Sequence, residues 1–342
     1  MDALLRRLSL LLLVVAIAAC TSPAPLPEVV AYTALDAEFS QPVFETFKGQ
    51  SGITVLAKFD TESTKTVGLA AAIIEEESRP RCDVFWNNEI LNTLRLEKRG
   101  LLEPFPSATD EVLPEMYRSP NDTWHALAAR ARVLIVNTEV TKKDGKTPRS
   151  ILDLADGRWH GRAGIAKPLF GTTATQAACL FAFWGPDKAK QFFQDLKDNQ
   201  VQIMAGNKQV ALAVGTGQLA LGLTDTDDAI AEIDKAMPVA IIYPDQGDNQ
   251  IGTLFIPNTV SIIKGAPHPH AARRLVDFLL SSEVESQLAL SSSAQIPLHS
   301  NVDVASRLKI PEGIKQMQVD FAAAADIWDT TARFLRDEFT GP

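Results

Sequence analysis

Short apolar runs alternate with longer amphipathic segments along most of this chain. The run at residues 29–32 is followed by an amphipathic segment from Asp36 to Gly49, and the run at 53–59 by another at 64–77. Short apolar runs predict buried strands, and apolar residues spaced by three or four positions predict helices. This alternation with short joins predicts an α/β protein whose mostly parallel sheet is covered by helices on both faces. The same order continues with expected strands at 83–86, 164–166, 201–204, 219–223, 239–243 and 252–256, and expected helices at 90–99, 150–155, 174–184, from Pro186, after Asn207 to 214, at 271–280, at 282–290 and, as a pair, within 312–338.

Two extended segments differ from this regular order. The segment 124–137 is longer than the other expected strands, so it can begin in one lobe of the protein and end in another. The segment 250–257 could carry the chain back. A chain of 342 residues is longer than one hydrophobic core usually organises. We therefore expect two lobes joined by these two segments.

The N-terminal residues have the organisation of an export signal. A short basic region at residues 1–7 precedes an apolar run at 8–19, and Cys20 follows immediately. The run is too short to span a bilayer as a mature helix. Ile17-Ala-Ala-Cys20 resembles the bacterial lipobox. We expect residues 1–19 to be a lipoprotein signal peptide, Cys20 to carry a diacylglycerol, and 20–28 to be a lipidated tether.

Charge and cysteine content narrow the function classes. The formal net charge is −9, and no basic stripe follows one face of an expected element, which argues against nucleic-acid binding. Besides Cys20, the chain contains only Cys82 and Cys179, which we place in different lobes. A disulfide between them would lock the lobes together, so we expect two buried thiols.

An acidic segment follows the expected strand at 219–223. Asp225, Asp227 and Asp228 supply three carboxylates within four residues. In an open α/β sheet, ligands collect at the carboxyl ends of strands, so this segment could form one wall of a ligand cleft. The alternative is a solvated turn whose carboxylates cap the next helix, from Asp228 or Ala229 onward. Hard oxygen donors of this kind could bind Fe(III), Mn(II), Mg(II) or Ca(II), or a protonated amine.

Two expected helix starts could accept an anion. Gly171-Thr172-Thr173 offers backbone N–H groups and hydroxyls at the positive end of a helix dipole, and Asn207 stands at another helix start. Such a site accepts a carboxylate, phosphate or carbonate, although capping alone would also explain these residues. No catalytic Ser-His-Asp or Cys-His order is recognisable, so an enzyme remains only as a metal-dependent hydrolase.

Several segments together resemble a known family. Asp83-Val-Phe-Trp86, Gly161-Arg-Ala-Gly-Ile-Ala166 with Phe170-Gly-Thr-Thr173, Gly265–Arg274 and Ile296-Pro-Leu298 are similar to segments of bacterial extracellular solute-binding proteins of the ferric-iron-binding type. These proteins are the receptors of ABC importers. The resemblance extends from Val29 to about Val304 and does not identify the ligand.

The resemblance implies a type II periplasmic-binding-protein fold, with two α/β lobes, two hinge strands and a ligand cleft between the lobes. It implies one lobe from 29–131 plus 256–300, and another from 132–255 plus 301–342. Ferric members hold iron with a histidine, a carboxylate and a pair of tyrosines, often together with an anion. These positions fall here on Asp36, on Asn88 with Glu89 beside it, and on Asp227 and Asp228, so the usual tyrosines are absent.

The resulting hypothesis is a substrate-binding lipoprotein of an ABC transporter. It would capture ferric iron or another hard cation, with carbonate or phosphate as an accompanying anion, and deliver it to a permease and its ATPase. The alternative ligand is a small organic cation or zwitterion such as an amine, an amino acid or a phosphonate-like solute. The expected ligand residues are Asp36, Asn88, Glu89, Gly171, Thr172, Thr173, Asn207, Asp225, Asp227 and Asp228, of which Asp36, Asp225, Asp227 and Asp228 could bind a metal. We expect no obligate cofactor, no catalysis, a monomer, and attachment to the membrane of the cell envelope only through the lipid on Cys20.

Overall fold

The computed structural model describes residues 27–60, 66–299, 302 and 307–340. The expected signal peptide and Cys20 lie outside these residues. Ten strands form one continuous sheet in the order β2-β1-β3-β10-β5-β8-β6-β7, with β4 paired to β10 and β9 to β5. The strands are β1 (Glu28–Thr33), β2 (Thr54–Phe59), β3 (Val84–Asn87), β4 (Leu102–Glu103), β5 (His125–Asn137), β6 (Ala163–Ala166), β7 (Gln202–Met204), β8 (Leu221–Asp225), β9 (Val239–Ile242) and β10 (Phe255–Ile263).

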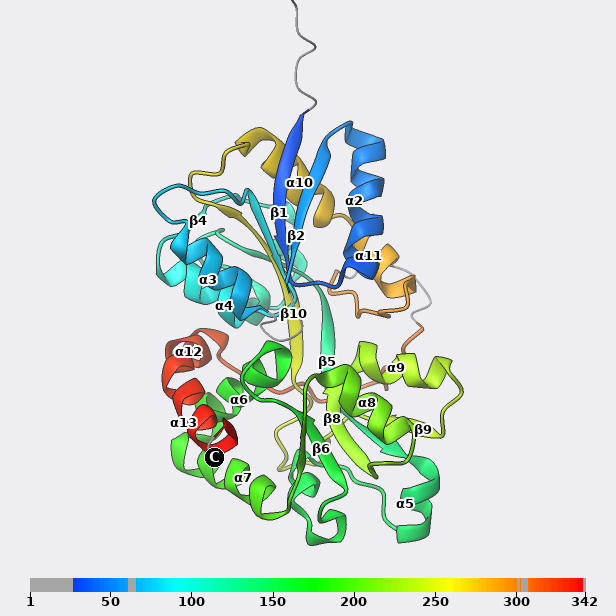
Figure 1. The fold of residues 1–342 in the computed structure, drawn as a ribbon. Helices are drawn as coiled ribbons and strands as arrows, with labels where there is room; N and C mark the ends of the chain where they lie inside the picture. The colour runs from blue at the N-terminus through cyan, green and yellow to red at the C-terminus, as the bar shows by residue number, and fades with distance from the viewer. Residues whose placement is uncertain (1–26, 61–65, 300–301, 303–306, 341–342) are drawn as a thin grey trace, which may run out of the picture.

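Helices cover the sheet over its whole length (Figure 1). The α-helices are α2 (Ala37–Ser51), α3 (Val67–Glu75), α4 (Leu91–Lys98), α5 (Thr138–Asp144), α6 (Gly171–Trp184), α7 (Pro186–Asp198), α8 (Asn207–Gly215), α9 (Thr226–Asp234), α10 (Pro269–Leu279), α11 (Ser282–Leu290), α12 (Phe321–Asp326) and α13 (Trp328–Thr340). Four short 3₁₀ helices lie at Ala108–Val112, Glu115–Tyr117, Ile151–Ala155 and Gly157–Trp159. The expected α/β class is therefore confirmed.

The elements gather into two lobes, one above the other in Figure 1. The upper lobe contains β1 to β4 with α2, α3, α4, α10 and α11, and the lower lobe contains β6 to β9 with α5 to α9. Strand β5 joins them, because residues 125–131 pair with β10 and residues 132–137 pair with β8 and β9. A strand of 13 residues therefore runs from one lobe into the other.

The sequence predicted a mostly parallel sheet, and the strand directions show that this prediction was wrong. Parallel pairs occur only toward the two ends of the sheet, β2-β1-β3 above and β8-β6-β7 below. Every pair that involves β5 or β10 is antiparallel. The reason is that strands which cross between lobes do not follow the strand–helix–strand order that makes neighbours parallel.

Two hydrophobic clusters stabilise this arrangement. One lies between the upper sheet and helices α2, α10 and α11, and includes Phe44, Trp86 and Leu275. The other is continuous through both lobes. Cys82 and Cys179 are buried and form no disulfide in the described chain, as expected, and burial raises the pKa of each thiol. Among the described helices, none is long and apolar enough to span a bilayer.

The C-terminal helices contact both lobes. Helix α12 packs against α4 of the upper lobe and α6 of the lower lobe, and α13 packs against α6. Arg95 of α4 lies 3.3 Å from the carboxylate of Asp329 on α13. The lobe boundaries inferred from the family resemblance stay a prediction.

Candidate functional site

A polar cavity of about 230 Å³ lies where the two lobes meet. It is lined by the ends of β6 and β8, by the residues after β3, and by the starts of α2, α6, α8 and α9. Carboxyl ends of parallel strands and amino ends of helices meet at the same edge of an α/β sheet, which explains why charged residues gather there. All but one of the expected ligand residues line this cavity: Asp36, Asn88, Gly171, Thr172, Thr173, Asn207, Asp225, Asp227 and Asp228.

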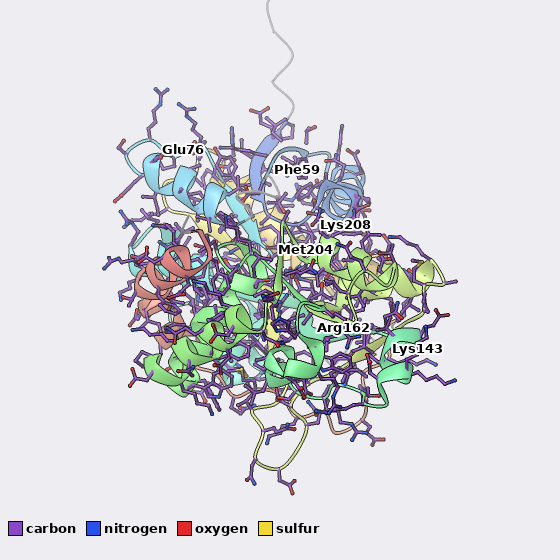
Figure 2. The ribbon with its side chains drawn as sticks, turned by 60° about the horizontal axis from the view of Figure 1, so that its bottom comes forward. Phe59, Glu76, Lys143, Arg162, Met204 and Lys208 are labelled. Atoms are coloured by element: carbon purple, nitrogen blue, oxygen red, sulfur yellow. The ribbon has the colours of Figure 1, made fainter. Side chains whose placement is uncertain are left out.

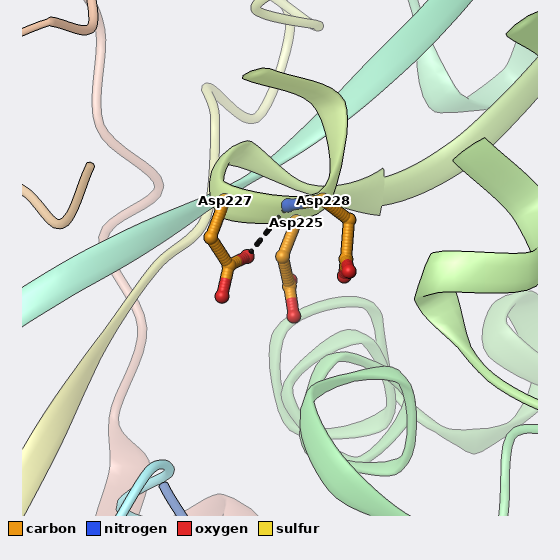
Figure 3. Close-up of side chains that lie close together, drawn as sticks. All are labelled: Asp225, Asp227 and Asp228. Atoms are coloured by element: carbon orange, nitrogen blue, oxygen red, sulfur yellow. Dashed lines mark hydrogen bonds between the residues drawn. The ribbon is translucent and has the colours of Figure 1, made fainter. Parts of the chain in front are cut away.

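The three aspartates come from the junction of β8 and α9. Asp225 is the last residue of β8, and Asp227 and Asp228 lie in the first turn of α9. This helix begins at Thr226, whereas the sequence predicted a start at Asp228 or Ala229. Their side chains point to the same side of the junction (Figure 3). One carboxylate oxygen from each lies within 4.8 Å of the others, a spacing that a metal ion could bridge. Asp225 does not cap α9 with its side chain, so its carboxylate has another role.

Two arginines of β5 are the functional residues that the sequence analysis missed. Arg130 and Arg132 are 5% and 0% exposed. A buried charge is stable only when it is paired. An arginine pair inside a long apolar strand was therefore the signal that these side chains must meet buried carboxylates.

The hydrogen-bond partners of the Arg132 guanidinium all lie in the lower lobe. It lies 2.7 Å from Asp225 Oδ1, and its Nε donates to Gln176 Oε1 at 2.8 Å. It also donates to the hydroxyls of Thr172 and Thr173 and to Asn207 Oδ1, at 3.1–3.2 Å. Each guanidinium nitrogen therefore has a partner.

Arg130 connects the two lobes instead. One terminal nitrogen lies 3.3 Å from Asp225 Oδ2 and 3.4 Å from Asp227 Oδ2, and the other donates to the carbonyl oxygen of Asn88 in the upper lobe. Its guanidinium thus occupies the position between two aspartates where a cation would bind. Burial alone would lower the pKa of Arg130, but Asp227, Asp225 and Asp228 raise it above its ordinary value.

Asp225 is ionised in this environment. Burial alone would raise its pKa, but Arg132 and Arg130 beside it, together with the Thr172 hydroxyl that donates at 2.5 Å, hold the pKa below its ordinary value. Asn207 Nδ2 donates to the same oxygen at 3.0 Å. Asp225 is consequently a partner of the two arginines, and its charge is already compensated.

Two helix starts line the cavity beside Asp225. Helix α6 begins at Gly171, whose φ of +56° suits glycine, and α8 begins at Asn207 after Gly206. Within the described structure neither helix has a side-chain cap, although α5, α11 and α12 each have one. The first backbone N–H groups of a helix lack partners inside it, so these two starts present donors to the cavity.

The side chains of this wall have a different role from the expected one. The Thr172 hydroxyl donates to Asp225, and Thr173 donates to Asn207 at 3.1 Å. These groups support the Arg132–Asp225 pair, so contact with an anion would come from the backbone. Lys208 lines the same cavity and lies toward the junction of the lobes, whereas Lys143 lies on the outer side of the lower lobe (Figure 2).

The upper lobe contributes Asp36 and Asn88. Asp36 precedes α2 and is exposed, but its carboxylate forms no helix cap among the described residues. Asn88 is buried, and its side-chain nitrogen donates to the carbonyl oxygen of Ala34 at 3.0 Å. Both residues line the same cavity as the lower-lobe carboxylates.

Glu89 is the expected ligand residue that does not line the cavity. It is fully buried, and its carboxylate accepts the backbone N–H groups of Leu91 and Asn92 at the start of α4. The hydroxyl of Thr175 on α6 donates to it at 2.8 Å, which adds a contact between the lobes. Because these donors use its oxygens, we leave Glu89 out of the ligand set.

Comparisons with known proteins show the family and the fold of the chain. The family model "Bacterial extracellular solute-binding protein" matches residues 92–325. A major ferric iron-binding protein of Neisseria meningitidis serogroup B is 29% identical over 83% of this chain and 85% of its own length. A periplasmic protein of Salmonella typhimurium, provisionally named for 2-aminoethylphosphonate binding, is 23% identical over 78% of this chain and 76% of its own.

Solved structures share the fold. Iron-bound HitA from Pseudomonas aeruginosa superimposes with a TM-score of 0.79 at 23% identity, covering 90% of this chain and 99% of its own. AfuA from Actinobacillus pleuropneumoniae, with fructose-6-phosphate bound, gives a TM-score of 0.80 at 24% identity, covering 92% and 99%. At this level of identity the likeness establishes the two-lobed fold alone.

Proposed function

We propose that this chain, which belongs to the bacterial extracellular solute-binding protein family, captures a small organic solute with an anionic group. It is a solute-binding protein of the ABC-importer class, whose members deliver their ligand to a membrane permease. In our proposal a phosphate, phosphonate or carboxylate of the solute binds at the starts of α6 and α8. The rest of the solute presents hydrogen-bond donors to Asp36, Asp227 and Asp228.

One observation carries this proposal: Arg130 already neutralises the carboxylates that a metal would need. Its nitrogen lies within 3.4 Å of both Asp225 and Asp227. Meanwhile α6 and α8 start without side-chain caps in the described structure, and their first residues line the cavity. A site that has built-in counter-ions for its buried carboxylate, and uncapped helix starts beside it, favours an anionic group over a bare cation.

Isothermal titration with a ligand panel tests the proposal. We expect inorganic phosphate, methylphosphonate or 2-aminoethylphosphonate to bind more tightly than ferric nitrilotriacetate. The related proteins named for 2-aminoethylphosphonate binding and crystallised with fructose-6-phosphate make such probes reasonable. Tight binding of the ferric complex together with no binding of any phosphate or phosphonate would contradict the proposal.

A hard cation with an accompanying anion is the second candidate ligand. It is supported by the three carboxylates within 4.8 Å and by the ferric iron-binding relatives. Arg130 would have to withdraw for such an ion to reach Asp225 and Asp227. Elemental analysis and native mass spectrometry of the protein as purified test this candidate. One bound iron per chain would support it.

We propose that the lobes close over the solute by bending at β5 and β10. The proposed lobes are 29–131 plus 256–300, and 132–255 plus 301–342. In β5, Ala128 has a φ of +41°, and its N–H donates to the buried carboxylate of Glu285. Small-angle scattering should give a smaller radius of gyration with phosphonate than without it. Identical curves at saturating ligand would contradict closure.

We also propose that the protein is a monomer without catalytic turnover, anchored in the cell envelope by a lipid on Cys20. The lipobox-like Ile17-Ala-Ala-Cys20 supports the lipid anchor. Cys20→Ser should abolish incorporation of labelled palmitate and release the protein from the membrane fraction. Recovery of mature protein that still carries residues 1–19 would contradict it.

A further inference from the structure

A buried hydrogen bond between Glu89 and Thr175 joins the two lobes. Glu89 follows β3 of the upper lobe, and Thr175 lies on α6 of the lower lobe. The Thr175 hydroxyl donates to Glu89 Oε2 at 2.8 Å, and both residues are 0% exposed. The residues that line the cavity include neither of them. This bond therefore depends on how the lobes meet and not on direct contact with a solute.

The acceptor is held in place by its own lobe. The carboxylate of Glu89 accepts the backbone N–H groups of Leu91 and Asn92 at 2.6 and 3.0 Å. The side-chain nitrogens of Asn87 and Asn92 donate to its Oε1 at 2.9 and 2.8 Å. All four donors belong to the upper lobe, so the carboxylate is in position before Thr175 reaches it. Thr175 adds a further donor from the other lobe.

The donor lies on a buried face of α6. Cys179 is one turn further along this helix and is also 0% exposed. Burial raises the pKa of its thiol, and the nearby Glu89 carboxylate raises that pKa further. A threonine hydroxyl within a helix can bond to the carbonyl of the preceding turn. Thr175 instead donates out of its helix, across the boundary between the lobes.

Other contacts across this boundary are less suited to hold the lobes together. Lys98 of α4 lies 2.5 Å from Asp326 of α12, but both side chains are exposed to solvent. Exposed ion pairs contribute little, because water and salt screen them. Arg130 donates to the Asn88 carbonyl oxygen, but Arg130 also lines the cavity, where a solute acts on it directly.

We infer that the Thr175–Glu89 hydrogen bond is a latch of the closed state, which forms when the lobes close and is replaced by water when they open. This inference rests on the proposed closure at β5 and β10. A buried hydrogen bond to a carboxylate stabilises the form in which it is made. Because the solute is enclosed in the closed form, loss of the latch lowers the affinity although Thr175 does not touch the solute.

Isothermal titration with 2-aminoethylphosphonate tests the latch. Thr175→Val keeps the shape of the side chain but removes the hydroxyl, and we expect it to bind this probe about tenfold more weakly than the wild type. Thr175→Ser keeps the hydroxyl and should bind within about twofold of the wild type. Thr175→Ala also lacks the hydroxyl and takes the place of the valine variant if that variant does not fold.

Thr331→Val is the matched control. Thr331 is a buried threonine of α13 whose hydroxyl has no hydrogen-bond partner among the described residues, so the affinity should stay unchanged. Wild-type affinity in Thr175→Val would overturn the latch. Equal losses in Thr175→Val and Thr175→Ser, or in Thr175→Val and Thr331→Val, would also overturn it. These outcomes leave the anion site standing.

Small-angle scattering without ligand separates the latch from the proposed function. If the wild type binds neither 2-aminoethylphosphonate nor inorganic phosphate, the proposed function fails, and the ligand-free proteins decide about the latch. A larger radius of gyration in Thr175→Val than in the wild type and Thr175→Ser would then support it, because fewer molecules are closed. Equal radii in the three proteins would overturn it.

Discussion

Arg130 and Arg132 are two residues apart in β5, so their side chains lie on the same face of the strand. Their surroundings nevertheless differ. Arg132 is enclosed within the lower lobe, and every guanidinium nitrogen has a partner there. Arg130 stands between the lobes and binds groups of both, and its Nε has no hydrogen-bond partner among the described residues. The difference teaches that one buried arginine supports the lower lobe while the other belongs to the ligand cavity.

The comparison also separates the three aspartates. Asp225 lies between both arginines and is 1% exposed, whereas Asp227 lies beside Arg130 and is half-buried. Asp225 is therefore expected to matter mainly for stability and Asp227 mainly for binding. The following experiments test that division, from the largest expected effect to the smallest.

Asp225→Asn should cause the largest loss of stability. The substitution leaves Arg132 buried without its charged partner, and breaking a buried ion pair costs about 3–5 kcal/mol of unfolding free energy. Urea denaturation monitored by circular dichroism measures the loss. Asp227→Asn is the matched control and should lose less, because Arg130 keeps Asp225 as a charged partner in that variant. Equal losses in the two variants would refute the division.

Arg130→Gln should turn the carboxylate cluster into a cation site. Without the guanidinium, no positive charge of Arg130 competes with a hard cation at Asp227 and Asp228, while Asp225 keeps Arg132 as its partner. We expect terbium(III) to bind about tenfold more tightly or better, equivalent to roughly 1.4 kcal/mol, measured by its luminescence. Arg130→Lys loses the planar fork but keeps the charge, so it should show no such gain. The explanation fails if the wild type and the glutamine variant bind terbium(III) equally.

The Arg132–Asp225 pair should also make the fold sensitive to acid. A carboxyl whose folded-state pKa lies below its ordinary value of 3.8 stabilises the fold above that pH, and the stabilisation disappears as the pH falls through the folded-state pKa. Glu285, whose pKa is also lowered, contributes in the same direction below 4.5. Denaturation between pH 5 and 2 should show a steep loss in the wild type and a shallower one in Asp225→Asn; parallel curves would contradict this.

Lys208→Ala should have the smallest effect. Lys208 is exposed at the start of α8, where its charge adds to the attraction of an anion but is screened by solvent. We expect about a threefold weaker affinity for inorganic phosphate at low salt and no difference at 1 M salt. Lys143→Ala, on the outer side of the lower lobe, is the control and should leave affinity unchanged. A salt-independent loss would point to a structural role.

Much of the fold could be predicted because local patterns dictate it. Most apolar runs became strands, and the long segment at 124–137 became β5, which crosses between the lobes. The strand expected at 252–256 instead begins at Phe255 and extends to Ile263 as β10. The junction at Asp225 to Asp228 and the helix starts at Gly171 and Asn207 were also predicted as walls of one cavity, because residues at strand ends and helix starts meet at one edge of an α/β sheet.

The tertiary structure decided what each of these groups does. The sequence by itself determined that carboxylates and helix starts would gather, since hydrophobic periodicity and turn chemistry are local properties. It did not determine which charge meets which, because Arg130 and Asp225 are 95 residues apart and their pairing depends on the register of β5 against β8. The same long-range packing assigned Glu89 to the start of α4, made the crossing strands antiparallel, and placed Arg130 where a cation was expected. Burial made that pairing obligatory, because a buried charge is stable only beside its counter-charge.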